Sequence, residues 1–318
     1  METLRALSRI HACPPERLES LAETVGRWFA PGEEISLSSE YPLLFRDHPA
    51  VRHYIVEEEE GQPLSHAALL VRHVVSGPAR LRIGMISCVA TAPEARGAGL
   101  ASEVVHWAVR SAADKHCALV LLWSELEHFY RGLGFERIGR EWIFLLGKEG
   151  FPGEYPEPIP YSETYASQVY SLYLKKSIRV ERSPGEMKTL LSIPRTSTYL
   201  AKGSSGEIEA YACMGKGRDF QGVIHECGGE PRALEQLLGG ILARSAEPVP
   251  LILSPLEESL GTLLAGKGIF PSEGALGLGK ILDPEAVERF ARSLGPLADR
   301  FRAPGPLVPF HLPGLDSV

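Results

Sequence analysis

The sequence predicts an α/β protein built from two consecutive domains, each a mixed, mostly antiparallel sheet flanked by helices. A chain of 318 residues, 44% of them apolar, is longer than one domain usually is and can bury a large core. The same order of predicted elements occurs twice. In each half, one apolar run shows no polar alternation, which is typical of a strand covered on both faces, as in parallel pairing.

The repeated pattern begins with a hairpin in each half. Tyr54–Gly61 and Tyr199–Gly206 each read as a strand that runs into a turn. Each is followed by a second extended segment, Pro63–Val75 and Glu207–Met214. Two such runs joined by a short turn predict an antiparallel hairpin.

A short apolar strand, a helical stretch and a continuous apolar run follow each hairpin. The short strands are Gly84–Val89 and Gly222–Cys227, and the apolar runs are Ala118–Trp123 and Val249–Leu253. Because the runs lack alternation, we expect them to be the parallel strands of their sheets.

After these runs the halves match again, since Ser124–Glu127 aligns with Ser254–Glu257. The shared order favours a duplication, and two unrelated mixed α/β domains remain the alternative.

The boundary is predicted within Gly147–Pro160, where glycine and proline interrupt helices and strands. The division is therefore residues 1–150 and 151–318. An amphipathic helix is expected at Asp283–Leu294, followed by a proline-rich tail around Ala303–Gly314 that packs across the body.

Composition restricts the functional classes. The net charge of -7 argues against general binding to a nucleic-acid backbone, which needs a concentrated positive surface. The start of the chain carries no secretory pattern, and no apolar run is long enough to span a bilayer, so a cytoplasmic protein is expected. The five scattered cysteines contain no CxxC pair and indicate reduced thiols, with neither a disulfide frame nor a metal site.

The most informative segment is Val89–Ser102, where a strand runs through a glycine-containing turn into a helix. The helix is expected to begin near Gly99 and to bury one stripe, formed by Leu100, Val104, Ala108 and Ala112. Its first N–H groups have no partner within the helix and lie at the positive end of its dipole, so they form a site for a phosphate or pyrophosphate. Gly97 and Gly99 can adopt positive φ there, and Arg96 adds charge.

Arg96–Ala101 resembles the Arg/Gln-x-x-Gly-x-Gly/Ala signature of the GNAT superfamily of acyl-CoA-dependent N-acetyltransferases. The lead-in Val89–Pro93 and the segment Phe129–Phe135 are also similar to that family. The resemblance extends to about residue 145. It implies a V-shaped opening between the fourth and fifth strands, near Ser87–Thr91 and Ala118–Ser124.

The resemblance implies acetyl-CoA as the co-substrate and assigns its contacts. Pantetheine would bond backbone groups near Val89, Ala90 and Thr91. The pyrophosphate would lie on the turn formed by Arg96, Gly97, Ala98, Gly99, Leu100 and Ala101. A backbone N–H of the fourth strand, that of Val89, could stabilise the oxyanion.

Acetyl transfer also needs a proton for the departing thiolate. Tyr130 is the candidate general acid, on a short helix whose packed stripe is expected to be Leu126, Phe129 and Leu133, with Gly134 capping its end. The alternative for Tyr130 is a boundary tyrosine bonded to a backbone carbonyl.

Glu125 is the candidate base, acting through a water, and its alternative is a residue that compensates a helix dipole. A water relay without a fixed base is also open. His66 and His73 could line the acceptor groove, or be half-buried strand residues. Cys88 is interpreted as a packed thiol.

The second half departs from this pattern. Cys227–Gln236 lacks the signature, Glu230 places a negative charge where a pyrophosphate would lie, and Leu260 matches Tyr130. This half is therefore expected to bind no CoA and to wall the acceptor site. Tandem proteins with one working copy are known in the superfamily, including mycothiol synthases and the enhanced intracellular survival type, whose third domain this chain is too short to hold.

The expected activity is transfer of acetyl from acetyl-CoA directly to a primary amine of a small molecule or peptide. The alternative is a non-catalytic acyl-CoA sensor. The expected partners are the amine acceptor only, with neither nucleic acid nor membrane, in a monomer with pseudo-dimeric halves or a homo-oligomer.

Overall fold

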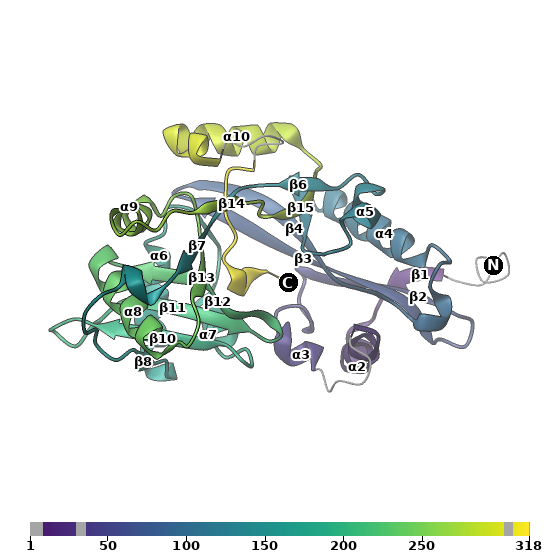
Figure 1. Cartoon of the computed structure of the whole chain (residues 1–318). Helices are drawn as coiled ribbons and strands as arrows, with labels where there is room; N and C mark the ends of the chain where they lie inside the picture. Colours follow the sequence, from purple (N-terminus) through teal and green to yellow (C-terminus); the bar gives the residue numbers. More distant parts are fainter. Residues whose placement is uncertain (1–8, 30–35, 302–307, 318) are drawn as a thin grey trace.

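The computed structural model describes residues 9–29, 36–301 and 308–317, and its elements form two mixed sheets side by side (Figure 1). The strands of the first sheet lie in the order β1 (Arg9–Ala12), β2 (Val51–Glu57), β3 (Pro63–Ser76), β4 (Ala79–Thr91), β5 (Leu119–Leu122), β15 (Gly277–Ile281) and β6 (Glu136–Ile138), while β9 (Arg179–Val180) pairs with the far end of β3. Pairing is antiparallel except between β4 and β5.

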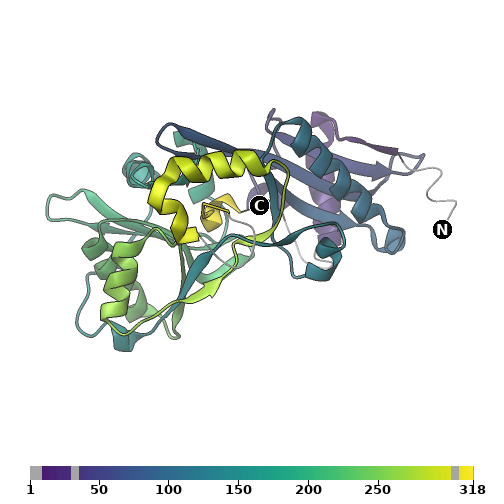
Figure 2. The same ribbon diagram turned by 90° about the horizontal axis from the view of Figure 1, so that it is seen from above.

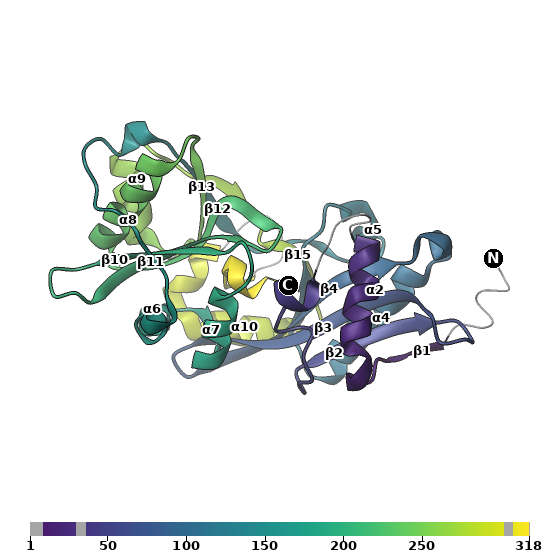
Figure 3. The same cartoon turned by 90° about the horizontal axis from the view of Figure 1, so that it is seen from below.

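Helices cover both faces of the first sheet (Figures 2 and 3). The helix α4 (Leu100–Asp114) packs on one face, and its buried residues include the whole predicted stripe, Leu100, Val104, Ala108 and Ala112. The opposite face carries α2 (Leu18–Phe29) and the single turn α3 (Leu37–Glu40). The short α5 (Glu127–Arg131) follows β5.

The second sheet repeats the plan. Its order is β14 (Ser272–Gly274), β7 (Glu141–Leu146), β13 (Val249–Leu253), β12 (Asp219–Gly229), β11 (Ile208–Lys216), β10 (Ser197–Lys202) and β8 (Ile159–Pro160). The parallel pair is β12 with β13. The accompanying helices are α6 (Ala166–Leu174), α7 (Pro184–Leu191), α8 (Pro231–Arg244), α9 (Glu258–Gly266) and α10 (Pro284–Leu294). The predicted hairpins and parallel strands are therefore present in both halves.

The sheets exchange strands across the predicted boundary. The strand β7 leaves the first half and pairs with β13, from Val249↔Leu146 to Leu253↔Trp142. In return β15 inserts between β5 and β6. The chain crosses between the sheets at Gly139, where φ is +72° and an added Cβ would lie 2.5 Å from Leu276. The division at residue 150 stays a prediction, and each sheet is completed by the other half.

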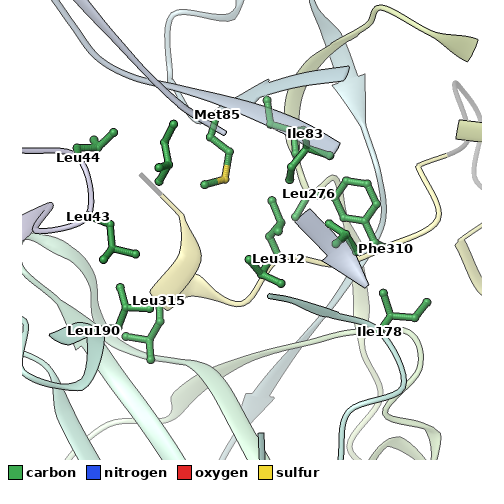
Figure 4. Close-up of a cluster of buried hydrophobic side chains, with 14 of the residues drawn as sticks. Leu43, Leu44, Ile83, Met85, Ile178, Leu190, Leu276, Phe310, Leu312 and Leu315 are labelled. Carbon is green, nitrogen blue, oxygen red and sulfur yellow. The ribbon is translucent and has the colours of Figure 1, made fainter. Parts of the chain in front are cut away.

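The C-terminal segment 308–317 is buried between the halves, as expected for the part of the tail that is described; residues 303–307 of that prediction lie outside the described residues. Phe310, Leu312 and Leu315 point into a core that also contains Met85 of β4 and Leu190 of α7 (Figure 4). The halves therefore share one hydrophobic core.

A buried ion cluster holds the same segment. Arg182 contacts Glu226 at 2.7 Å and Asp316 at 2.6 Å, and all three side chains are inaccessible to solvent. Lys216 donates to the Ser317 carbonyl. Buried charges need such complete pairing, because their desolvation is costly.

The predicted helix at residues 283–294 is confirmed. It is α10, capped by Asp283, with Val287, Phe290, Ala291 and Leu294 buried. All five cysteines are free thiols. Within the described ranges, no helix has both the length and the apolarity that crossing a bilayer requires.

Candidate functional site

The strands β4 and β5 separate at their carboxyl ends, as predicted. Their parallel register covers only Ile83↔Leu119, Gly84↔Val120 and Met85↔Leu121. Beyond Met85, β4 continues to Thr91 beside β3, whereas β5 ends at Leu122. An opening therefore forms between them.

A β-bulge bends β4 at this opening. His66 pairs with Ala90, but Ala68 pairs with Ser87, so β4 carries one extra residue between these pairs. Cys88, within this stretch, has φ of +49°, in the left-handed region that residues with a side chain seldom adopt. The bulge redirects the strand that leads to the glycine turn.

The turn before α4 presents a group of unpaired amides. Gly97 and Gly99 have φ of +79° and +85°, which glycine adopts without strain. Among the described residues, the N–H groups of residues 97–101 donate to no protein acceptor, whereas those of Ser102 and Glu103 bond the Gly99 carbonyl at 3.1 and 3.3 Å. A Cβ added at Gly97 would meet nothing within 4 Å, so the turn is open. It has the character of an anion site.

This turn opens into a cavity of about 730 Å³, which we call the first cavity. That volume is typical of small-molecule sites. Every predicted cofactor-binding residue except Ala98 lines it. The described lining is Trp28, Phe29, Val89, Ala90, Thr91, Ala95, Arg96, Gly97, Gly99, Leu100, Ala101, Ser102, Leu126, Phe129 and Tyr130. Arg96 is exposed at the rim, and its Nε donates to the Thr91 carbonyl at 3.3 Å. Sequence reasoning missed Trp28 and Phe29, which arrive from α2.

Tyr130 reaches the first cavity from α5. The predicted stripe was wrong at Leu126, which is 67% exposed, whereas Phe129 and Leu133 pack against the core as predicted; Tyr130 itself is 5% exposed. The α5 helix has only five residues, too few for periodicity to identify its buried face. The capping expectation for Gly134 is confirmed. Gly134 has φ of +82°, and the Phe135 N–H donates to the Tyr130 carbonyl at 3.1 Å.

Burial determines the protonation of the phenol. It raises the pKa of Tyr130 to about 12, although the Ser124 hydroxyl acts in the opposite direction. The rings of Phe129 and Phe135 pack edge-on around it at 4.9 and 5.8 Å. Tyr130 is therefore a protonated donor at neutral pH.

The other sequence candidates lie apart from this cavity. Glu125 is exposed in the turn before α5 and does not line the first cavity. Of the two alternatives for His66 and His73, the structure favours strand residues over lining of an acceptor groove. His66 is completely buried within the sheet, and His73 faces a different cavity at the far end of β3. Cys88 is a buried thiol, as expected, and burial raises its pKa to about 12.

A second cavity, of about 310 Å³, lies on the other side of the β5–α5 turn. Trp123 and Ser124 line it from the first half, His225 from β12, and Leu312 and Gly314 from the C-terminal segment. Ser124 lines this second cavity while Tyr130, on the helix that follows, lines the first, so the two cavities lie on either side of the same segment. Residues of both halves line this cavity, and its individual lining residues could not be predicted because they are far apart in sequence.

One carboxyl group in the second cavity lacks a close cation. Glu141, at the start of β7, has a 15% exposed side chain, and His311 Nδ1 lies 3.8 Å from its carboxylate; this ring is neutral at pH 7, because burial lowers the pKa of His311 to about 4. Burial raises the pKa of Glu141 to about 7. This carboxyl group therefore titrates near neutral pH.

The start of α8 in the second copy differs from the glycine turn before α4. Its parallel pairing is limited to Ile224↔Leu251. The α8 N-cap is Glu230 and its first residue is Pro231, which has no N–H to donate. Leu260, at the position matching Tyr130, is buried. Lys176 and Glu257 form an ion pair of 2.6 Å near the corresponding opening.

Comparison with known proteins agrees with this geometry. Residues 35–138 match the family model of the acetyltransferase (GNAT) domain. No curated protein matches the chain.

Several solved structures share the fold of most of the chain. One is a probable N-acyltransferase from Enterococcus faecalis, 17% identical over 88% of this chain and 74% of that one, with a TM-score of 0.66. A GCN5-related N-acetyltransferase from Kribbella flavida is 17% identical over 88% and 72%, with a TM-score of 0.62. Eis1 from Mycobacterium abscessus is 14% identical over 89% and 76%, with a TM-score of 0.60.

At these identities the structures establish the fold, while the domain match covers the segment that carries the glycine turn. Residues 35–138 are therefore similar to a GNAT acetyltransferase domain, and the two-sheet chain shares the fold of these solved structures.

Proposed function

We propose that this protein is an N-acetyltransferase that moves the acetyl group of acetyl-CoA directly to a primary amine of a small molecule or peptide. The observation that carries the proposal is the first cavity, where unpaired amides at one end and the buried Tyr130 hydroxyl at the other border the same space. The family match supports acyl transfer in general, and the amine acceptor is part of the proposal.

The donor would bind along the β4 edge. The diphosphate would accept hydrogen bonds from the amides of residues 97–101, with Arg96 adding charge at the rim. Pantetheine would follow Val89, Ala90 and Thr91 toward the bulge. This places the thioester near Tyr130 and fixes it for attack.

In the transfer step the amine nitrogen bonds to the thioester carbon, and the C–S bond then breaks. The Val89 N–H would stabilise the oxyanion, and Tyr130 would donate a hydrogen to the departing sulfur. The proton that the amine loses balances the proton that the thiolate gains. Because the pKa of Tyr130 is about 12, its hydroxyl keeps its hydrogen until the sulfur leaves.

The acceptor would occupy the second cavity, which the second half walls. Glu141 there could take the proton of an incoming ammonium group, since its pKa is about 7. Glu125 stays a proposed base, acting through a water. The second copy is proposed to bind no CoA, because Glu230 and Pro231 occupy the start of its helix.

An acyl-CoA sensor without turnover is the second candidate function. It is favoured by one observation: no carboxylate or histidine is among the described residues that line the first cavity. A sensor would bind acetyl-CoA without releasing free CoA.

Release of free CoA from acetyl-CoA, measured with a panel of primary amines for the wild type and for Tyr130→Phe, tests the enzyme. Amine-dependent release that falls in Tyr130→Phe supports the proposal. Binding of acetyl-CoA without release for any amine would contradict it and support the sensor.

A further inference from the structure

Two buried histidines form a chain of contacts that ends on the bulge of β4. His53 Nε2 lies 3.1 Å from the Leu44 carbonyl, and His53 Nδ1 lies 2.9 Å from His66 Nε2. His66 Nδ1 lies 2.7 Å from the carbonyl of Cys88. The exposed fractions of His53 and His66 are 3% and 0%, so water does not replace these contacts.

Hydrogen counting fixes the role of His66. Both outer partners are carbonyls, which only accept, and a neutral imidazole carries one N–H. Burial lowers the pKa of His53 to about 4 and that of His66 to about 3, so both rings are neutral at pH 7. Two hydrogens must then serve three contacts. The shortest of the three contacts is the 2.7 Å between His66 Nδ1 and the Cys88 carbonyl oxygen. Without a hydrogen on Nδ1, a nitrogen lone pair would face an oxygen lone pair at that distance, so His66 carries its hydrogen on Nδ1.

The Cys88 carbonyl belongs to the same peptide unit as the Val89 N–H. That unit is planar and trans, because the described chain contains no cis peptide, and its C=O and N–H therefore point in opposite directions. A side chain that fixes the carbonyl also fixes the direction of the N–H.

We propose that His66 is a positioning residue for acetyl transfer: its Nδ1–H bond to the Cys88 carbonyl aims the Val89 N–H at the acyl carbonyl of the donor. The bond also polarises the peptide, which makes the N–H a stronger donor. At a bulge with φ of +49° at Cys88, the regular ladder does not set this plane, so a side chain takes over that function. His53 supports this tautomer if its own hydrogen lies on Nδ1 and is donated to His66 Nε2, which leaves the Leu44 contact, the longest of the three at 3.1 Å, without a hydrogen.

This inference rests on the proposed function, since it needs acetyl-CoA in the first cavity. The test therefore measures two quantities separately, the affinity for acetyl-CoA and the polarisation of its thioester carbonyl. Acetyl-CoA labelled with ¹³C at the thioester carbonyl is bound to the full-length protein, and the carbonyl stretch is recorded by isotope-edited infrared spectroscopy. Calorimetry gives the acetyl-CoA affinity of each variant, and failure of the wild type to bind would refute the proposed function itself.

Three substitutions of His66 distinguish a role in positioning the Val89 N–H from a role in the stability of the fold. His66→Asn keeps a donor at the Nδ1 position, His66→Gln moves the donor to the Nε2 position, and His66→Leu removes it. We expect the stretch of bound acetyl-CoA to move to lower frequency in the wild type and in His66→Asn. The shift should be lost in His66→Gln and His66→Leu, with acetyl-CoA affinity within about twofold of wild type, because misdirection of one donor acts on the carbonyl alone.

Where turnover is measurable, His66→Gln should lower kcat by about 10- to 100-fold relative to His66→Asn. The comparison of His66→Asn with His66→Gln remains available if His66→Leu fails to fold, because both are polar and similar in size. Equal carbonyl stretches in these two variants would overturn the inference.

Discussion

Ser124 lies just before α5 and Tyr130 lies on it, and each of these two residues borders a different cavity. Tyr130 lines the first cavity, where the glycine turn lies, and Ser124 lines the second, between the halves. The β5–α5 turn therefore separates a candidate donor site from a candidate acceptor site. A reaction between their occupants would take place at this turn.

Tyr130→Phe should lower kcat by about 10²- to 10⁴-fold, the range typical of a positioned acid. CoA affinity should stay near that of the wild type, because the ring and its packing remain. Steady-state kinetics with calorimetry on both proteins checks this. Unchanged kcat would assign the tyrosine a packing role only.

Gly97→Glu should weaken CoA binding by at least tenfold. The substitution introduces a negative charge into the anion site and strains a residue whose φ is +79°. Calorimetric titration with CoA measures it. Glu230→Ala in the second copy is the matched control, and it should bind CoA as the wild type does; equal losses in both variants would show that the site has been misplaced.

Glu141→Gln should remove a pH dependence near neutrality. The pKa of Glu141 is about 7, so its basic carboxylate form becomes populated as the pH rises through 7 and is lost below it. In the wild type, kcat/KM for the amine should rise through this range. In the variant, kcat/KM for the amine should not rise through this pH range, and the KM for acetyl-CoA should equal that of the wild type. An identical pH profile in the variant argues against Glu141 as the base.

Arg182→Met should destabilise the fold by about 3–5 kcal/mol, because it leaves the buried Glu226 and Asp316 without their cation. Urea unfolding gives the free energy. Arg292→Met is the control, since its pair with Glu288 is exposed on both sides and should contribute less than about 1 kcal/mol. Similar losses for the two variants would contradict the account of the buried cluster.

Local sequence patterns predicted the parts of the site that are formed by residues close together in the sequence. Two glycines, an arginine and a stripe at every fourth position were sufficient to predict the anion turn and the buried face of α4. The strand exchange was not predictable, because the apolar pattern of residues 141–146 is the same whichever sheet they join. Glu141 reaches the second cavity only through that exchange, and Trp28 reaches the first cavity through α2, far from the glycine turn in sequence.

The central claim is that the amides opening α4 hold the diphosphate of CoA. Isothermal titration of the full-length chain with CoA tests it most directly. We expect one molecule bound per chain, in the N-terminal half alone, with affinity that falls in Gly97→Glu. No measurable uptake of CoA at millimolar ligand, or uptake that Gly97→Glu leaves unchanged, would contradict the account.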